Sequence, residues 1–227
     1  MLFVPGLKSG NEDRDAMRSY RRQYYNLFSY FYDFIIRLHS QDKAGYLRRF
    51  IVDKAKLVEG GRALDICTGT GSVAIELSRQ AGNDGMSVGV DFSRGMLDKA
   101  RNKVEKLGIK NVHFVEANVS ELPFKTDSFH ATTCSHAFYE LKGAERGKTI
   151  KEVARVNKKG GRFCMMEHEV PENPFVKMLF YLRMYFMGST DAKIFLKEDT
   201  LPFKEEFRKV KKEITTTGKS KLIWAEK

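Results

Sequence analysis

Several features that mark other protein classes are missing from this sequence of 227 residues. No run reaches the roughly 18 apolar residues that a membrane-spanning helix needs. The four apolar residues before Pro5 are too few for the core of a signal peptide. The three cysteines, Cys67, Cys134 and Cys164, stand far apart, so we expect neither a disulfide framework nor a CxxC metal site. Small buried thiols in a reducing cytoplasm are the favoured interpretation.

Positive charge is in excess, but it is not concentrated. The chain has 40 Lys and Arg against 29 Asp and Glu, a net charge of +11. Residues 1–60 and 193–227 each carry a net charge of +4, and the residues between them +3. A specific groove for nucleic acid usually needs clustered charge, so the spread argues against a nucleic-acid partner. It is as compatible with contact to an anionic membrane surface.

Short apolar runs alternate with longer helical patterns between about residues 60 and 170. The predicted strands are 63–67, 86–90, 112–115, 129–134 and 162–166, and the predicted helices are 72–81, 94–107 and 145–156. This alternation predicts a parallel sheet with right-handed crossovers. Two more strand-like runs, at about 209–216 and 220–226, predict a terminal antiparallel hairpin. We therefore expect a doubly wound α/β sheet of seven strands.

The first predicted strand ends in a glycine loop with an acidic residue before it. Asp65 stands four residues before Gly69, and Gly71 follows just ahead of the next helix. The glycines permit a tight turn and close approach of a ligand to the backbone. Asp91 ends the second predicted strand, where a carboxylate can take both hydroxyls of a ribose. The pattern predicts a nucleoside-containing ligand beyond the carboxyl ends of the strands.

Two ligand classes fit this loop. Residues 69–74 also match the dinucleotide pattern GxGxxA, so an NAD-type enzyme is an alternative. The charge of Asp65 opposes it, because a carboxylate beside the loop repels a pyrophosphate and suits an ammonium group.

The motif Asp65-x-x-x-Gly69-x-Gly71 resembles the first motif of class I S-adenosylmethionine-dependent methyltransferases. Similar segments follow at 90–97, 116–124, 127–129 and 155–162, and the resemblance covers about residues 60–168. The Leu-Pro-Phe and Asp-Ser-Phe words and the Gly-Gly-Arg turn most resemble the branch of ubiquinone/menaquinone-biosynthesis C-methyltransferases. The resemblance implies a Rossmann-like fold, S-adenosylmethionine as cofactor, S-adenosylhomocysteine as product and no metal.

The resemblance also implies roles for individual residues. Asp65 lies near the methionine ammonium group, Asp91 takes the ribose hydroxyls, and Asn118 offers its amide to the adenine edge. The family more often has Asp at that last position, but an amide has both a donor and an acceptor. The other donor-binding residues implied are Thr68, Gly69, Gly71, Phe92, Met96, Val119, Cys134 and Ser135.

A sulfonium carries an already activated methyl group, so the protein mainly has to orient a nucleophile. A general base helps if that nucleophile is an aromatic carbon or a phenol. We expect His136, Tyr139 and His168 at the catalytic edge, although each histidine also fits a structural, hydrogen-bonded role. The segment 135–141 does not match the pattern associated with quinone enzymes, which leaves the acceptor and the methylated atom open.

The two ends of the chain are expected to enclose a hydrophobic acceptor that is quinone- or lipid-like. Residues 1–58 form a predicted helical cap, and the methyltransferase domain covers 59–227 with a lid insertion at about 171–200. The apolar run 175–187 either packs on the core or forms a Met-rich lid that touches the acceptor or lipid. The expected acceptor-binding residues are Tyr24, Tyr25, Phe28, Phe180 and Met184.

Three other functions stay open. The first is methylation of RNA or protein, which the positive charge supports; no RNA-binding module or Asn-Pro-Pro-Tyr-type word is present in the sequence. The others are an NAD-type enzyme and a donor-binding protein without catalysis. The oligomeric state is open as well.

Overall fold

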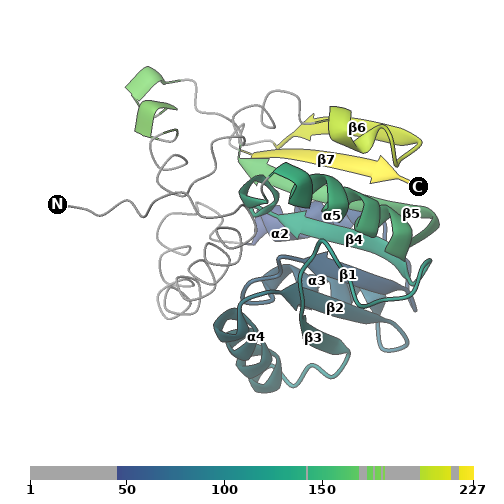
Figure 1. The fold of residues 1–227 in the computed structure, drawn as a ribbon. Helices are drawn as coiled ribbons and strands as arrows, with labels where there is room; N and C mark the ends of the chain where they lie inside the picture. The colour runs from purple at the N-terminus through teal and green to yellow at the C-terminus, as the bar shows by residue number, and fades with distance from the viewer. Residues whose placement is uncertain are drawn as a thin grey trace, which may run out of the picture.

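In the described part of the chain, seven strands form one sheet (Figure 1). The computed structural model describes residues 45–141, 143–168, 173–175, 177–179, 181, 200–215 and 220–227. The strand order is β3-β2-β1-β4-β5-β7-β6. The strands are β1 (Arg62–Ile66), β2 (Met86–Asp91), β3 (Val112–Glu116), β4 (Phe129–Ser135), β5 (Asn157–His168), β6 (Lys209–Ile214) and β7 (Ser220–Glu226).

The strands β1 to β5 pair in parallel, and β7 lies antiparallel between β5 and β6. The predicted doubly wound sheet with a C-terminal hairpin is therefore confirmed. β1 pairs with β2 on one side and β4 on the other, so the strand order reverses at this point. In sheets of this kind ligands bind beyond the carboxyl ends of the strands at the reversal, which is where β1 and β4 end.

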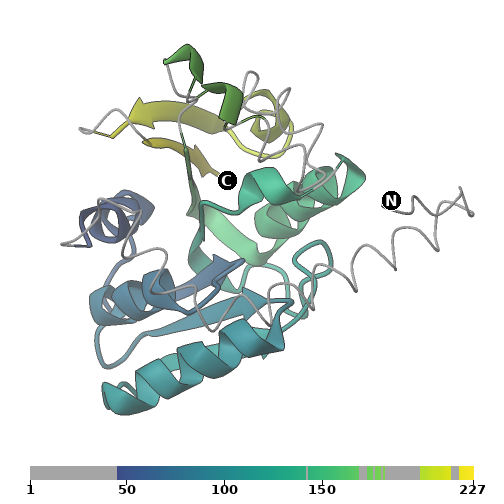
Figure 2. The same cartoon turned by 90° about the vertical axis from the view of Figure 1, so that its left-hand side faces the viewer.

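Helices cover both faces of the sheet, as Figure 2 shows. α2 (Tyr46–Ala55), α3 (Ser72–Ala81) and α4 (Arg94–Lys106) lie on one face, and α5 (Gly143–Val156) lies on the other. Two short 3₁₀ turns, η1 (Phe138–Glu140) and η2 (Leu201–Phe203), lie on the α5 face. A parallel sheet covered twice needs strands that are apolar throughout, and the middle strands meet this requirement with almost every residue buried.

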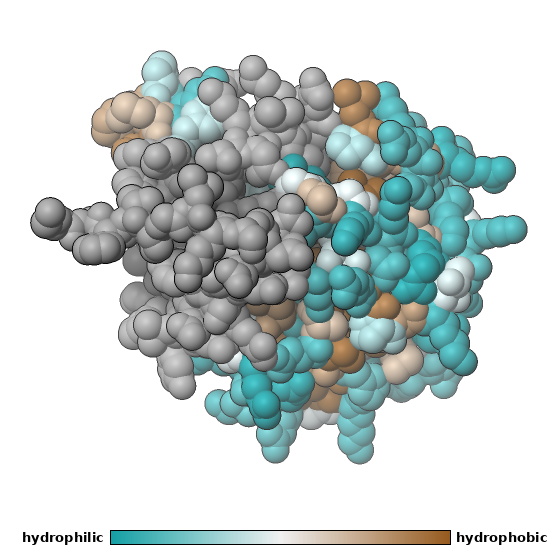
Figure 3. Space-filling model, in the orientation of Figure 1, coloured by the Kyte–Doolittle hydropathy of each residue, from teal (hydrophilic) through white to brown (hydrophobic). Residues whose placement is uncertain are grey.

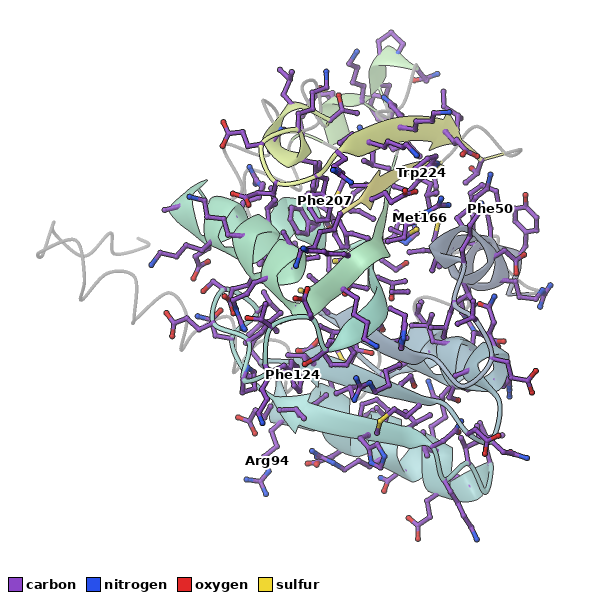
Figure 4. All side chains as sticks on the ribbon, turned by 90° about the vertical axis from the view of Figure 1, so that its right-hand side faces the viewer. Phe50, Arg94, Phe124, Met166, Phe207 and Trp224 are labelled. Atoms are coloured by element: carbon purple, nitrogen blue, oxygen red, sulfur yellow. The ribbon has the colours of Figure 1, made fainter. Side chains whose placement is uncertain are left out.

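Successive side chains of β5 and β7 point to opposite faces. Met166 and Trp224 pack with Phe50 on the α2 face, and Phe207 packs on the α5 face against Phe163, with ring centroids 6.2 Å apart (Figure 4). The C-terminal hairpin is thus part of both cores rather than an appendage.

Most element boundaries differ from those predicted by one or two residues, and two of the differences are informative. β1 ends at Ile66 instead of Cys67, because Cys67 has a positive φ of 52° that ends the strand. β5 begins at Asn157, five residues before the predicted start at 162. A register shift between β4 and β5 near Phe129 accommodates this early start. A turn residue in the left-handed region leaves no trace in a hydrophobicity pattern.

Parts of the predicted cap and lid lie outside the described residues. Of the cap, residues 45–58 are described, including α2. The predicted acceptor-binding residues Tyr24, Tyr25, Phe28, Phe180 and Met184 all lie outside. On the face shown in Figure 3 the described surface is mainly hydrophilic, with smaller apolar areas.

Candidate functional site

The glycine loop lies between β1 and α3 and is held by backbone hydrogen bonds, one of them to β2. The Thr68 N–H donates to Val90 O at 3.0 Å, and the Gly71 N–H donates to Thr68 O at 2.9 Å. Gly71 has φ 76°, and a Cβ there would lie 2.7 Å from Phe114 Cζ. Gly69 has φ 53°, and a Cβ there would meet nothing within 4 Å. Gly71 is therefore required by packing, whereas Gly69 borders open space.

Asp65 lies on β1 and is only 2% exposed. Its two oxygens accept hydrogen bonds from Thr68 Oγ1 at 2.5 Å and from Thr133 Oγ1 at 2.6 Å. Burial raises the pKa of Asp65 to about 6, and the charge of Asp91 adds to the rise. An ionised carboxylate without a cation is costly in such a place, so the site is suited to a positively charged ligand.

Asp91 ends β2 and is 6% exposed. Its Oδ2 accepts from the Gly69 N–H at 2.8 Å and its Oδ1 from the Ser93 N–H at 2.9 Å. Burial raises its pKa to about 6. A hydrogen bond from the Phe92 backbone opposes that rise. Asp91 thus holds the glycine loop in place from the end of β2, the position where a carboxylate can bind a ribose.

Four more of the residues predicted to bind the donor lie on segments that follow β2 and β3. Phe92 is half-buried and Met96 is 2% exposed. The Ala117 N–H donates to Asp91 O at 3.1 Å, which places the segment after β3 next to the end of β2. Asn118 is half-buried and its Oδ1 accepts from the Ser120 N–H at 3.1 Å, while Val119 is buried in the α5-side core.

At the end of β4 the chain carries Cys134, Ser135 and His136. Cys134 is fully buried, and burial together with a hydrogen bond to Cys67 raises the pKa of its thiol. His136 has φ 54°. Its Nδ1 lies 3.0 Å from Ser135 Oγ and its Nε2 lies 3.3 Å from Ser220 Oγ. A ring between two hydroxyls is held in a defined orientation, whichever nitrogen carries the proton.

The other two predicted catalytic residues flank this point. Tyr139 lies in η1 and is 6% exposed. His168 ends β5 and pairs with Ser220 of β7. Ser220 therefore links His136 and His168, because it pairs with His168 in the sheet and its hydroxyl lies against the ring of His136.

Sequence reasoning missed two residues that shape the site. Thr133 donates to Asp65, and Ser93 both donates its N–H to Asp91 and caps α4 by accepting from the Met96 N–H at 3.3 Å. The sequence did contain a signal for Ser93, because serine is a preferred N-cap residue before a helical pattern. Thr133 had none, since its contact depends on the register of β1 against β4.

Other candidate sites are weaker. An open hollow of about 430 Å³ lies at the start of β6 and is lined by Lys204 and residues 207–211. Lys209 pairs with Glu226, and Glu226 pairs with Arg162 near the start of β5. The hollow therefore lies at the amino end of β5, away from the carboxyl ends of the strands where the glycine loop lies. The described residues contain no group of His, Cys, Asp and Glu that could hold a metal. Among them, no helix is long and apolar enough to cross a membrane.

The chain is similar to known proteins in both sequence and structure. Residues 16–203 match the model of the ubiE/COQ5 methyltransferase family. A ubiquinone/menaquinone biosynthesis C-methyltransferase of Geobacter sulfurreducens is 35% identical over 157 residues, which cover 69% of this chain and 60% of that protein. A demethylmenaquinone methyltransferase of Lactococcus lactis is 37% identical over 135 residues, which cover 57% of this chain and 52% of that protein. The chain thus spans between half and two thirds of the length of these relatives.

A solved structure has the same fold. The SAM-dependent methyltransferase of Aquifex aeolicus aligns with a TM-score of 0.59 and 20% identity, over 84% of this chain and 92% of that one. At this identity the likeness concerns the fold alone, and it confirms the Rossmann-like arrangement of strands.

Proposed function

The chain belongs to the ubiE/COQ5 methyltransferase family, and on this premise we propose that it transfers a methyl group from S-adenosylmethionine to a ring carbon of a hydrophobic, quinone-like acceptor. The membership confirms the resemblance inferred from the motifs at Asp65, Gly69 and Gly71. The relatives named for menaquinone and ubiquinone biosynthesis support the choice of acceptor.

One observation carries the proposal: two buried carboxylates face an open glycine loop where the strand order reverses. Asp91 ends β2 beside the loop and accepts from two backbone N–H groups, and Gly69 borders open space. Asp65 is buried, and its raised pKa marks a place where a cation is favoured. These residues fit a ligand that carries a ribose and an ammonium group, as S-adenosylmethionine does.

Each residue then has a defined task. Asp91 binds the ribose hydroxyls, and Asp65, with Thr68 beside it, attracts the ammonium group. Phe92, Met96, Asn118 and Val119 surround the adenine, and Cys134 and Ser135 border the methionine end. When bound, S-adenosylmethionine supplies a methyl group that is already activated.

We propose His136 as the group that accepts the proton released at the acceptor. It follows β4, and its ring is held between the hydroxyls of Ser135 and Ser220. In the neutral ring one nitrogen donates to a hydroxyl and the other accepts from one, so a proton would reach the accepting nitrogen through the serine hydroxyl that is bonded to it. Tyr139, in the turn that follows β4, and His168, which pairs with Ser220 in the sheet, are the next candidates.

Apolar side chains near the described start of the lid support a hydrophobic acceptor. Phe175, Met178 and Leu179 are 65%, 54% and 45% exposed. The described residues 173–175 and 177–179 stand out at the upper left of Figure 3. Exposed apolar side chains grouped in one short segment mark contact with an apolar partner, either the acceptor itself or a lipid surface.

The proposal is tested by methyl transfer in vitro. The protein is incubated with isotopically labelled S-adenosylmethionine and a prenylated naphthoquinol that lacks the ring methyl group, under reducing conditions. We expect one labelled methyl on a ring carbon, identified by mass spectrometry and NMR. The proposal is wrong if the quinol stays unlabelled while RNA or protein is labelled in the same assay.

A further inference from the structure

Asn118 follows β3 beside the end of β2, and its side chain is fixed by the turn in which it stands. The Ala117 N–H donates to Asp91 O at 3.1 Å, which joins the residue before Asn118 to the end of β2. The Asn118 Oδ1 accepts from the Ser120 N–H at 3.1 Å, and the Asn118 O accepts from the Glu121 N–H at 3.0 Å. A side-chain oxygen that accepts from the N–H two residues on forms an Asx turn. The half-buried amide of Asn118 is therefore held in one orientation.

An ion pair on α5 anchors the far end of the same segment. Arg155 donates from Nε and Nη2 to the two oxygens of Glu152, at 2.7 and 2.9 Å. Arg155 also donates from Nη2 to Leu122 O at 3.0 Å and from Nη1 to Phe124 O at 2.7 Å. In return, the Leu122 N–H donates to Glu152 Oε2 at 2.7 Å. Residues 117–124 are thus held at both ends by contacts within the protein.

The bond with Ser120 decides which atom of the Asn118 amide is left for a ligand. A backbone N–H can only donate, so the side-chain atom that faces it is the oxygen. The NH₂ group then points away from the Ser120 N–H, and it donates to no residue in the part of the chain that the structure describes. An NH₂ group of this kind is a donor only. A ligand that meets the outer atom of this side chain therefore meets a donor.

Adenine presents two kinds of polar group along its edges. Its exocyclic amine donates, whereas ring nitrogens such as N3 and N7 accept. In the proposed site Asn118 adjoins the adenine, so its NH₂ group can donate to a ring nitrogen. Two donors do not hydrogen-bond to each other, and the oxygen of the side chain already serves the Ser120 N–H. Recognition of the exocyclic amine would need an acceptor where the NH₂ group stands.

We propose that Asn118 makes the base-binding part of the site indifferent to the exocyclic amine of the donor. Asn118 is the specificity-determining residue, and Arg155 and Glu152 are positioning residues that hold its segment. Selectivity for the donor then rests on its ribose and its amino acid, which Asp91 and Asp65 bind. This inference rests on the proposed function, since it needs a site that binds an adenosyl amino acid.

The test is calorimetric titration of the full chain with two ligands. These are S-adenosylhomocysteine and its 6-deamino analogue, which carries purine in place of adenine and so lacks only the exocyclic amine. For the wild type we expect dissociation constants that differ by less than about fivefold, because no hydrogen bond to the amine is lost. A site that binds the amine through a charged or buried acceptor would lose about tenfold or more.

Replacing the NH₂ group with an oxygen should create the missing selectivity. Asn118→Asp keeps one oxygen for the Ser120 N–H and turns the other outward as an acceptor. We expect it to raise the preference for S-adenosylhomocysteine over the analogue by at least about fivefold relative to the wild type, since only adenine can donate to the new carboxylate. Asn102→Asp, at an exposed position on α4, adds the same charge elsewhere and should keep the wild-type ratio.

The role of the ion pair is tested in the same ratio. Adding Arg155→Met to Asn118→Asp should lower the new preference, because the segment loses its anchor and the carboxylate its fixed position. A loss of folding stability alone would leave the ratio of the two ligands unchanged, so the readout separates positioning from a general structural role.

The outcomes that count against the inference are distinct from those that count against the proposed function. A wild type that binds the analogue about fivefold or more weaker than S-adenosylhomocysteine overturns the inference. A smaller change of the ratio in Asn118→Asp than the one expected overturns it as well. A wild-type chain that binds neither ligand overturns the proposed function instead.

Discussion

Replacing Asp65 with asparagine should stabilise the free protein at neutral pH while weakening the donor site. The structure gives the size of the effect. A rise of the pKa from the ordinary 3.8 to about 6 corresponds to about 3 kcal/mol of folding free energy once the carboxyl is ionised. Asparagine is close in shape to the protonated acid, and the hydroxyls of Thr68 and Thr133 can each donate or accept. We expect Asp65→Asn to recover about 1 to 3 kcal/mol.

The sign of the pH dependence follows from the same numbers. At about pH 3 and below, under the unfolded-state pKa of 3.8, the carboxyl is protonated in the folded and the unfolded chain, and the charge costs nothing. As the pH rises towards 6 and above, the unfolded chain ionises first, and the folded wild type loses stability relative to it. The advantage of Asp65→Asn should therefore be near zero at about pH 3 and complete at about pH 7.5.

Urea unfolding of both proteins across this pH range measures the difference. Asp98→Asn, an exposed position on α4 paired with Arg101, is the matched control and should show no such trend. Binding of S-adenosylhomocysteine, followed in parallel, should weaken in Asp65→Asn. Our reasoning about the buried carboxylate is refuted if Asp65→Asn is less stable than wild type at pH 7.5, or if the difference does not change with pH.

Three further predictions concern other parts of the fold and site. Gly71→Ala should lower the free energy of unfolding, measured in urea, by about 2 to 5 kcal/mol, because a Cβ at φ 76° would lie 2.7 Å from Phe114. Gly108→Ala is the control: at φ 65° and with no neighbour within 4 Å of the added Cβ, it should lower that free energy by only about 1 kcal/mol. His136→Asn, which tolerates the left-handed backbone, should lower kcat much more than donor affinity; unchanged turnover removes His136 from the mechanism. Phe138→Ala should cost about 3 to 5 kcal/mol by thermal or chemical unfolding, since the ring is fully buried between two others.

The strands, the helices and the glycine loop could be predicted because each leaves a local pattern. The predicted helix at 72–81 coincides with α3, and β6 and β7 pair antiparallel where the hairpin was predicted. Asp65, Gly69, Gly71 and Asp91 could be selected as candidates for the donor site because strand ends of a doubly wound sheet converge on one edge.

The contacts that tune these groups could not be predicted. The bond from Thr133 to Asp65 spans 68 positions, and its existence depends on the parallel register of two strands. The link from Glu167 to the N–H groups of η1 joins strand ends 28 and 29 positions apart. A hydrophobicity pattern records which face a residue occupies but not which polar atom it meets there. For that reason the hydrogen bonds from η1 to Glu167 can be recognised only in the folded chain.

The central claim is that the two buried carboxylates and the glycine loop bind an adenosyl amino acid. Calorimetric titration of the wild-type chain and of Asp91→Asn with S-adenosylhomocysteine and with NAD tests it most directly. We predict that S-adenosylhomocysteine binds the wild type, that Asp91→Asn loses most of this affinity because an amide NH₂ replaces an acceptor beside the Gly69 N–H, and that NAD does not bind. Binding of NAD in place of S-adenosylhomocysteine, or equal affinity of S-adenosylhomocysteine for both proteins, would contradict the claim.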